Sequence, residues 1–110
     1  MNQQEFDLEV EKSIIRSKKS LVEKGIEYSS KDLDRLGHFD RLGHFYRAGA
    51  AQNIHPTEAL MGMAMKHVTS IADMVKNPYD FNLKKFNEKI TDLRNYTILL
   101  DALIRDMGIE

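Results

Sequence analysis

Two carboxylates and an amide lie along one line of the last predicted helix. Glu88, Asp92 and Asn95 are spaced at i, i+4 and i+7, which places their side chains in a row on one helical face. The row runs into the largely apolar stretch 98–104, so we expect it at the mouth of a cleft. Two carboxylates one turn apart can hold Mg²⁺, which keeps water and substrate phosphates as its other ligands. The alternative is an exposed helix face, where neighbouring lysines pair with the acidic side chains.

A histidine on the methionine-rich segment is a second candidate for chemistry. His67 is in line with apolar residues four and seven positions away in both directions, so its imidazole is expected on the buried side of a helix. A buried imidazole needs a partner, and a neighbouring carboxylate is the usual one. Lys66 and Asp73 border the apolar arc, and Lys66 would point at phosphate if the two helices share a cleft. Alternatively, His67 is a core histidine bonded to another helix, and its charged neighbours form a solvated face.

Glycine, proline and apolar periodicity divide the chain into helices. Apolar residues recur at helical spacing over three stretches, at about 3–24, 57–76 and 83–107. Gly25 is predicted to end the first helix and to open a polar loop over 25–32, and Thr57 is predicted to cap the second helix. With a shorter fourth helix, the pattern predicts one all-α domain over residues 1–110, a compact bundle of three long helices plus one shorter helix.

A hexapeptide, DRLGHF, occurs twice in succession, at 34–39 and 40–45. Six residues advance a helix by about 600°, so the two copies cannot present the same side chains to one surface of a straight helix. We therefore expect a local duplication, natural or engineered, with one copy packed and the other extruded. The alternative is a functional pair of the two histidines, His38 and His44.

Composition and missing motifs exclude several classes of protein. The 110 residues include 16 basic and 17 acidic side chains, so the chain lacks the basic surplus of a general nucleic-acid binder. It has no cysteine, which removes disulfides, thiolate metal sites and cysteine nucleophiles. No apolar run approaches about 18 residues, and the polar, acidic N-terminus is unlike a signal peptide, so we expect a cytoplasmic protein with no membrane contact. The sequence contains no glycine-rich phosphate loop, HExxH motif or nucleophile elbow.

Four stretches resemble a known group of proteins: EKGIEYSSKDLDRLGHF, PTEAL, KHVTSIADMV and EKITDLRNYTILLDALI. They are similar to small phage and prophage proteins grouped with nucleotide-modification-associated and MazG-like all-α NTP pyrophosphohydrolases. In that family a four-helix arrangement carries acidic motifs on two helices, and these motifs bind Mg²⁺ and the phosphates of the nucleotide. The family's second motif, an E-x-x-x-D before an apolar stretch, is similar to Glu88 and Asp92 here. Its first motif, a doubled E-x-x-E, has no counterpart, because the segment 61–76 offers one aspartate.

The resemblance implies a protein that binds a nucleoside triphosphate in the host's cytoplasm. It further implies Mg²⁺- or Mn²⁺-dependent hydrolysis to the monophosphate and pyrophosphate, where catalysis survives the missing first motif. The residues assigned to these roles are Glu88, Asp92 and Asp73 for the metal, Lys66 and His67 for catalysis, and Asn95 and Tyr96 for the sugar or base.

The alternative to an enzyme is a non-catalytic helical interaction module of phage origin. Its last two helices would bind another protein or a second copy of the chain. In both interpretations we expect a homodimer or a larger symmetric oligomer formed through these two helices. A chain this small with so many apolar positions on them should expose a patch as a monomer.

Overall fold

The regular structure of the protein is helical. The computed structural model describes residues 1–29 and 40–110, and these residues include no strand. The elements, in chain order, are α1 (Gln3–Ser29), α2 (Gly43–Gln52), α3 (Pro56–Met74), a short 3₁₀ helix η1 (Pro78–Asp80), and α4 (Leu83–Asp106). The predicted all-α fold, with three long helices and a shorter one, is confirmed.

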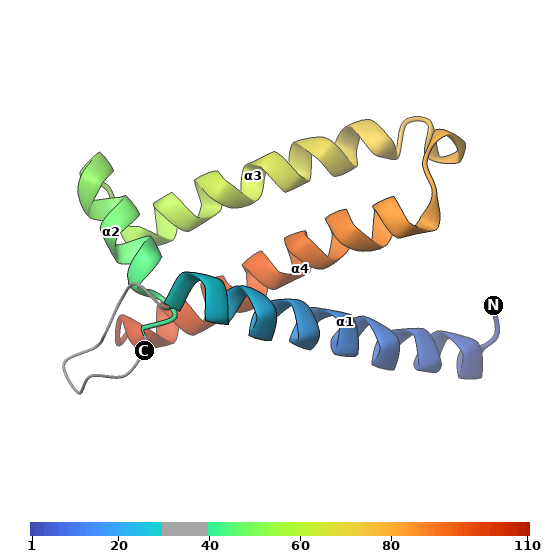
Figure 1. Ribbon diagram of the computed structural model, residues 1–110, viewed down its shortest axis with the longest axis horizontal. Helices are drawn as coiled ribbons and strands as arrows, with labels where there is room; N and C mark the ends of the chain where they lie inside the picture. The colour runs from blue at the N-terminus through green and yellow to red at the C-terminus, as the bar shows by residue number, and fades with distance from the viewer. Residues whose placement is uncertain (30–39) are drawn as a thin grey trace.

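The helix α4 lies between α1 and α3, and α2 packs against α3 (Figure 1). The turn around η1 reverses the chain, so α3 and α4 run antiparallel. In Figure 1, α1 lies closest to α4 near its own C-terminal part and diverges from α4 toward the N-terminus. No helix among the described residues is both long enough and apolar enough to span a bilayer.

The hydrophobic core lies where α2, α3 and α4 meet. The cluster at this junction is built on Phe45 of α2, Leu60 of α3 and Leu103 of α4, all of them buried. Fully burying one side chain of this size contributes about 1.5–3 kcal/mol, so these three residues hold the three helices together. The partly buried residues packed around them are Leu42, Tyr46, Met63, Tyr96, Leu99, Leu100 and Met107.

The ends of α3 and α4 follow ordinary capping chemistry, with one correction to the prediction. The side chain of Asn82 accepts a hydrogen bond from the backbone N–H of Lys85 at 2.8 Å and so caps α4. Gly108, with φ of 75°, follows α4 and its C-cap Met107. The predicted cap at Thr57 is wrong, because Pro56 takes the first helical position and His55 becomes the N-cap. A proline suits that position, since its φ is already helical and its missing N–H has no partner there.

The predicted end of the first helix at Gly25 is also wrong. The helix α1 continues for about one further turn, to Ser29. A Cβ atom on Gly25 would lie 3.3 Å from Nε of Arg41, so the glycine admits a neighbouring segment at close range. This close approach is a tertiary requirement that the local sequence pattern does not reveal.

The second copy of the hexapeptide, Asp40–Phe45, leads into α2, where Gly43 and Phe45 are buried. The first copy, 34–39, lies outside the described residues. The contrast between a packed and an extruded copy therefore stays a prediction, and so does the pairing of His38 with His44.

Candidate functional site

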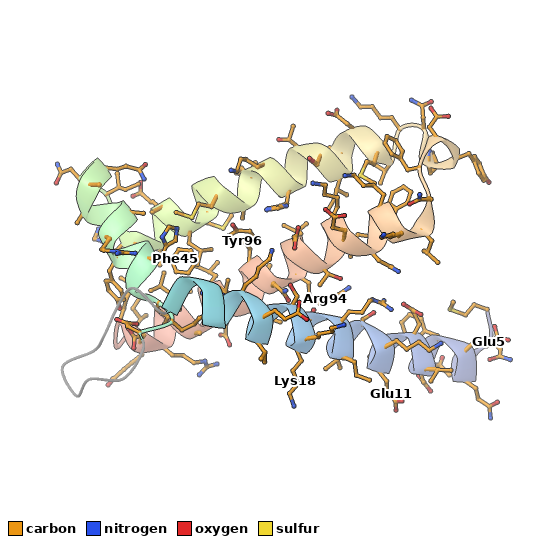
Figure 2. The ribbon with its side chains drawn as sticks, in the orientation of Figure 1. Glu5, Glu11, Lys18, Phe45, Arg94 and Tyr96 are labelled. Carbon is orange, nitrogen blue, oxygen red and sulfur yellow. The ribbon has the colours of Figure 1, made fainter. Side chains whose placement is uncertain are left out.

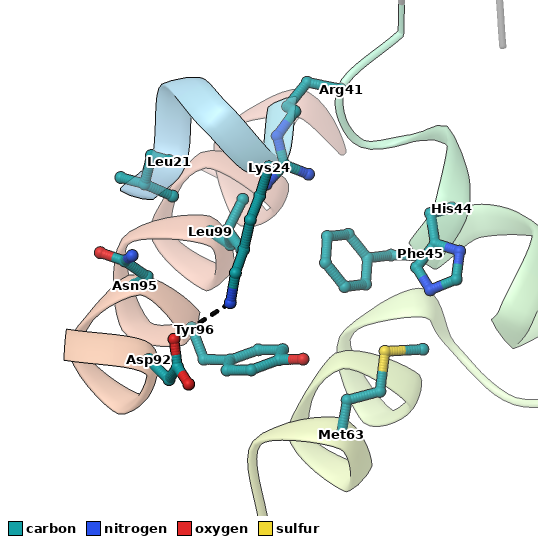
Figure 3. A pocket seen from close by; sticks show the side chains of 10 residues that line it. All are labelled: Leu21, Lys24, Arg41, His44, Phe45, Met63, Asp92, Asn95, Tyr96 and Leu99. Atoms are coloured by element: carbon teal, nitrogen blue, oxygen red, sulfur yellow. Dashed lines mark hydrogen bonds and ion pairs between the residues drawn. The ribbon is translucent and has the colours of Figure 1, made fainter. Parts of the chain in front are cut away.

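A small pocket lies where all four helices approach one another (Figure 3). Its volume is about 70 Å³. A water molecule in the liquid occupies about 30 Å³, so the pocket admits a small group or one end of a larger ligand. The residues that line it are Leu21, Lys24, Arg41, His44, Phe45, Met63, Asp92, Asn95, Tyr96 and Leu99.

The amide of Asn95 lines this pocket without a hydrogen-bond partner. The residue is only 4% exposed, and neither its nitrogen nor its oxygen is bonded to any part of the chain that the structure describes. In Figure 3 the side chain lies near Leu21, between α4 and α1. An unsatisfied buried polar group costs about 1–3 kcal/mol. Asn95 therefore holds an adjacent donor and acceptor that a ligand can satisfy.

The carboxylate of Asp92 is held between groups from two other helices. Nζ of Lys24 on α1 donates to Oδ1 at 3.0 Å, the contact that is dashed in Figure 3. Nδ1 of His67 on α3 lies 3.8 Å from Oδ2, within ion-pair range but too far for a hydrogen bond. Since its side chain is 16% exposed, Asp92 is largely shielded from water, and its pair with Lys24 ties α1 to α4.

His67 is held in its neutral form by its surroundings. Burial lowers the pKa of His67 below its ordinary value. Asp92 opposes this shift, whereas Lys89 and Lys24 reinforce it. The ring of His67 also lies 5.1 Å, centroid to centroid, from the ring of Tyr96, which lines the pocket. The imidazole thus packs as an aromatic group and remains an acceptor at neutral pH.

Aromatic side chains also line the pocket. Tyr96 comes from α4 and Phe45 from α2, and both belong to the helical core (Figure 2). His44 lies edge-on to Phe45, with 5.6 Å between the ring centroids. Flat rings around a small opening are suited to stacking against a flat ligand.

The structure brings together four of the residues singled out from the sequence. Asp92, Asn95 and Tyr96 line the pocket, and His67 lies behind it, against Asp92 and Tyr96. Lys66 lies next to His67 on α3, but its side chain is exposed. The row predicted on the last helix therefore divides, and its C-terminal part lines the pocket.

The other two carboxylates assigned to the metal lie elsewhere. Glu88 is exposed and lines a separate, shallow depression together with Asp80 and Lys84. The side chain of Asp73 is 72% exposed and pairs with Lys76 at 3.8 Å. Within the described ranges, no three side chains of His, Asp or Glu are grouped closely enough to hold a metal ion. The predicted Mg²⁺ or Mn²⁺ site stays a prediction, and the residues named for it do not form a ligand set here.

The cationic side of the pocket was missed by the sequence analysis. It consists of Lys24 from α1 and Arg41 from the segment before α2. The sequence indicates only weakly that Lys24 belongs to a site. It shares a helical face with Ser17 and Ser20, and in the structure this face lies toward α4. Apart from its place in the repeated hexapeptide, nothing in the sequence singles out Arg41.

Comparison with known proteins identifies no relative of this chain. No family model matches it, and neither a curated protein nor a solved structure does. The function is therefore inferred from the geometry of the pocket.

Proposed function

We propose that the pocket around Asn95 binds a nucleotide, with the edge of the base or sugar at the amide and the phosphates on the cationic side. The observation that carries this proposal is the buried, unsatisfied amide of Asn95. A nucleobase edge presents a donor beside an acceptor, the pattern that an asparagine amide bonds in both directions at once. Satisfying both groups on binding would remove a cost that the free protein bears.

The charges around the pocket support an anionic ligand. Among the described residues that line the pocket, Lys24 and Arg41 are cationic and Asp92 carries a carboxylate. A guanidinium matches two phosphate oxygens at once, whereas an ammonium acts as a point charge. Tyr96 would contribute a stacking surface for the base.

The size of the pocket limits how a nucleotide would sit. A volume of about 70 Å³ is smaller than the roughly 300 Å³ at the lower end of sites for drug-sized ligands. One end of the nucleotide would therefore enter the pocket, and the rest would extend along its mouth. Hydrolysis to the monophosphate and pyrophosphate would need carboxylates beyond Asp92 to be brought to the phosphates. Binding is accordingly the function proposed for this pocket.

Titration calorimetry with a panel of nucleoside triphosphates and monophosphates, with and without Mg²⁺ or Mn²⁺, tests the proposal. We expect saturable binding to the wild-type chain and a loss of at least tenfold in affinity in the Asn95→Leu variant. Asn77→Leu, which changes an exposed amide outside the pocket, is the matched control and should bind like wild type. Equal binding by both variants, or no binding by the wild type, would overturn the proposal.

A second candidate function is a helical module for protein interaction. It is favoured by the large apolar side chains that α1 and α3 leave exposed, among them Ile15 and Met65. Assays of nucleotide binding and of pyrophosphate release together separate the two candidates. Release that depends on Mg²⁺ or Mn²⁺ would support the enzyme, whereas neither release nor nucleotide binding would leave the interaction module.

A further inference from the structure

The helix α1 directs several polar side chains toward α4 and leaves most of its large apolar side chains exposed. Arg94 of α4 donates hydrogen bonds to the carbonyl oxygen of Ser13 at 3.1 Å and to the hydroxyl of Ser17 at 2.9 Å. Ser17 is 3% exposed, so the α1–α4 contact has a polar centre. A surface helix normally places its apolar stripe against the core of its own chain. Among the side chains of α1 that the structure describes, the large apolar ones that are exposed are Phe6, Leu8, Val10, Ile14, Ile15 and Val22.

A groove between α1 and α4 continues this apolar surface. Ile14, Leu21 and Val22 line it from α1, and Ile98 and Leu99 line it from α4. Ile14 is 61% exposed and Ile98 is 43% exposed, so both are open to solvent in a single chain. Contiguous apolar surface of this kind marks a place where another surface binds.

The chain is also less compact than expected for its length. Its radius of gyration is 16.2 Å. A compact chain of 110 residues would have a radius of gyration of about 13 Å. The excess reflects α1, whose N-terminal part diverges from α4 in Figure 1 and is exposed throughout residues 1–8.

The charges of α1 are segregated along its length in a self-complementary way. The acidic side chains of its first part are Glu5, Asp7, Glu9 and Glu11, with no basic residue among positions 1–11. The second part carries five basic residues against two acidic ones, Glu23 and Glu27; the basic residues are Lys12, Arg16, Lys18, Lys19 and Lys24. An antiparallel pair of these helices would set the acidic part of each against the basic part of the other. A parallel pair would oppose like charges along its whole length.

We propose that a second copy of this chain docks on α1, helix against helix and antiparallel, about a twofold axis near Ile14 and Ile15. The partner's helix covers the groove between α1 and α4. A twofold axis makes one self-complementary patch serve both copies, so the assembly closes as a dimer. Apolar positions in the sequence predicted association through the last two helices, whereas the exposed residues of α1 favour this other surface.

The first experiment removes the apolar contact. Light scattering of the full wild-type chain should give twice the chain mass of 12.7 kDa at high micromolar concentration. The double variant Ile14→Gln with Val22→Gln should give the single-chain mass at unchanged helix content, because both side chains are exposed in the monomer. The control, Met65→Gln with Val75→Gln, changes one exposed position on α3 and one at its C-cap, and should remain a dimer. A monomeric wild type, or a control that dissociates while the α1 variant stays dimeric, would refute the proposal.

The second experiment tests the antiparallel arrangement by exchanging charges. Glu11 and Lys18 are both exposed, lie on opposite sides of the proposed axis and point away from α4 (Figure 2). Glu11→Lys alone and Lys18→Glu alone should each weaken the dimer at least tenfold, since each variant opposes like charges across the axis. An equimolar mixture of the two variants should restore dimers, because every cross-axis pair then has opposite charge. If the mixture dissociates as readily as its components, the antiparallel pairing is wrong.

Discussion

The buried amide of Asn95 lowers the stability of the fold and is also the group proposed to bind the ligand. A single substitution, Asn95→Leu, tests its effect on stability apart from its role in binding. Leucine has nearly the shape of asparagine but no polar atoms. Asn95→Leu should therefore raise the free energy of unfolding by about 1–3 kcal/mol, because it removes a buried donor and acceptor that have no partners. In thermal denaturation, about 1 kcal/mol corresponds to a rise of roughly 4–8 °C for a domain near this size. A lower melting temperature would mean that the amide is satisfied in solution.

His67 makes stability depend on pH in a direction that follows from its lowered pKa. The unfolded chain binds a proton at the ordinary histidine pKa of about 6.5, whereas folded His67 binds it only at lower pH. Acid therefore lowers the free energy of the unfolded state more than that of the folded state. The contribution of His67 to the stability of the fold is present above about pH 6.5 and is lost as the pH falls.

This pH dependence is tested by measuring melting temperatures from about pH 8 to pH 5 in steps of about half a pH unit. The range covers both sides of the ordinary histidine pKa. The wild type should lose more stability toward acid than His67→Gln, whose other three histidines are unchanged. Parallel curves for the two proteins would contradict the assignment.

Sequence spacing could place Asp92, Asn95 and Tyr96 near one another, because residues three and four apart share a helical face. It could not find Lys24 or Arg41. Lys24 lies 68 positions from Asp92, and no local period encodes a contact between helices so distant in the chain. For the same reason it could not show that Glu88 and Asp73 face solvent at different places.

At the scale of the helices, α1 is attached differently from the other three. The helices α2, α3 and α4 share buried apolar residues, whereas α1 is joined to α4 by Arg94 and by the pair of Lys24 with Asp92. Apolar periodicity predicted where the three long helices lie. It missed the extension past Gly25 and the cap at His55, since close packing and proline geometry override local preference at helix ends.

Arg94→Met should loosen α1 without unfolding the rest. The substitution keeps the aliphatic stem but leaves the buried hydroxyl of Ser17 without its donor. Hydrogen bonds from charged groups contribute about 1.5–3 kcal/mol, so amide exchange in the middle of α1 should accelerate by roughly tenfold or more. Amides in α3 and the second half of α4 serve as the internal control and should keep their protection. Equal acceleration in all helices would show that the four helices open as one unit.

At the scale of the whole molecule, self-association should make stability depend on concentration. A dimer that forms only from folded chains raises the melting temperature as the protein concentration rises. Melting curves over a hundredfold range of concentration should shift upward for the wild type and remain fixed for the Ile14→Gln and Val22→Gln double variant. A wild-type midpoint that does not move would leave the exposed face of α1 without a partner in solution.

Lys24 belongs to two contacts at once, since it holds α1 to α4 through Asp92 and also lines the pocket. Under the proposed function, a bound phosphate and Asp92 would both interact with this lysine. Ligand binding would therefore change the strength of the contact between α1 and α4. If α1 is also the dimer contact, the nucleotide becomes an effector of assembly. Linkage is reciprocal, so the factor by which dimerisation changes nucleotide affinity is the factor by which nucleotide changes the dimerisation constant. The protein concentration at which dimers dissociate would then report the amount of nucleotide present.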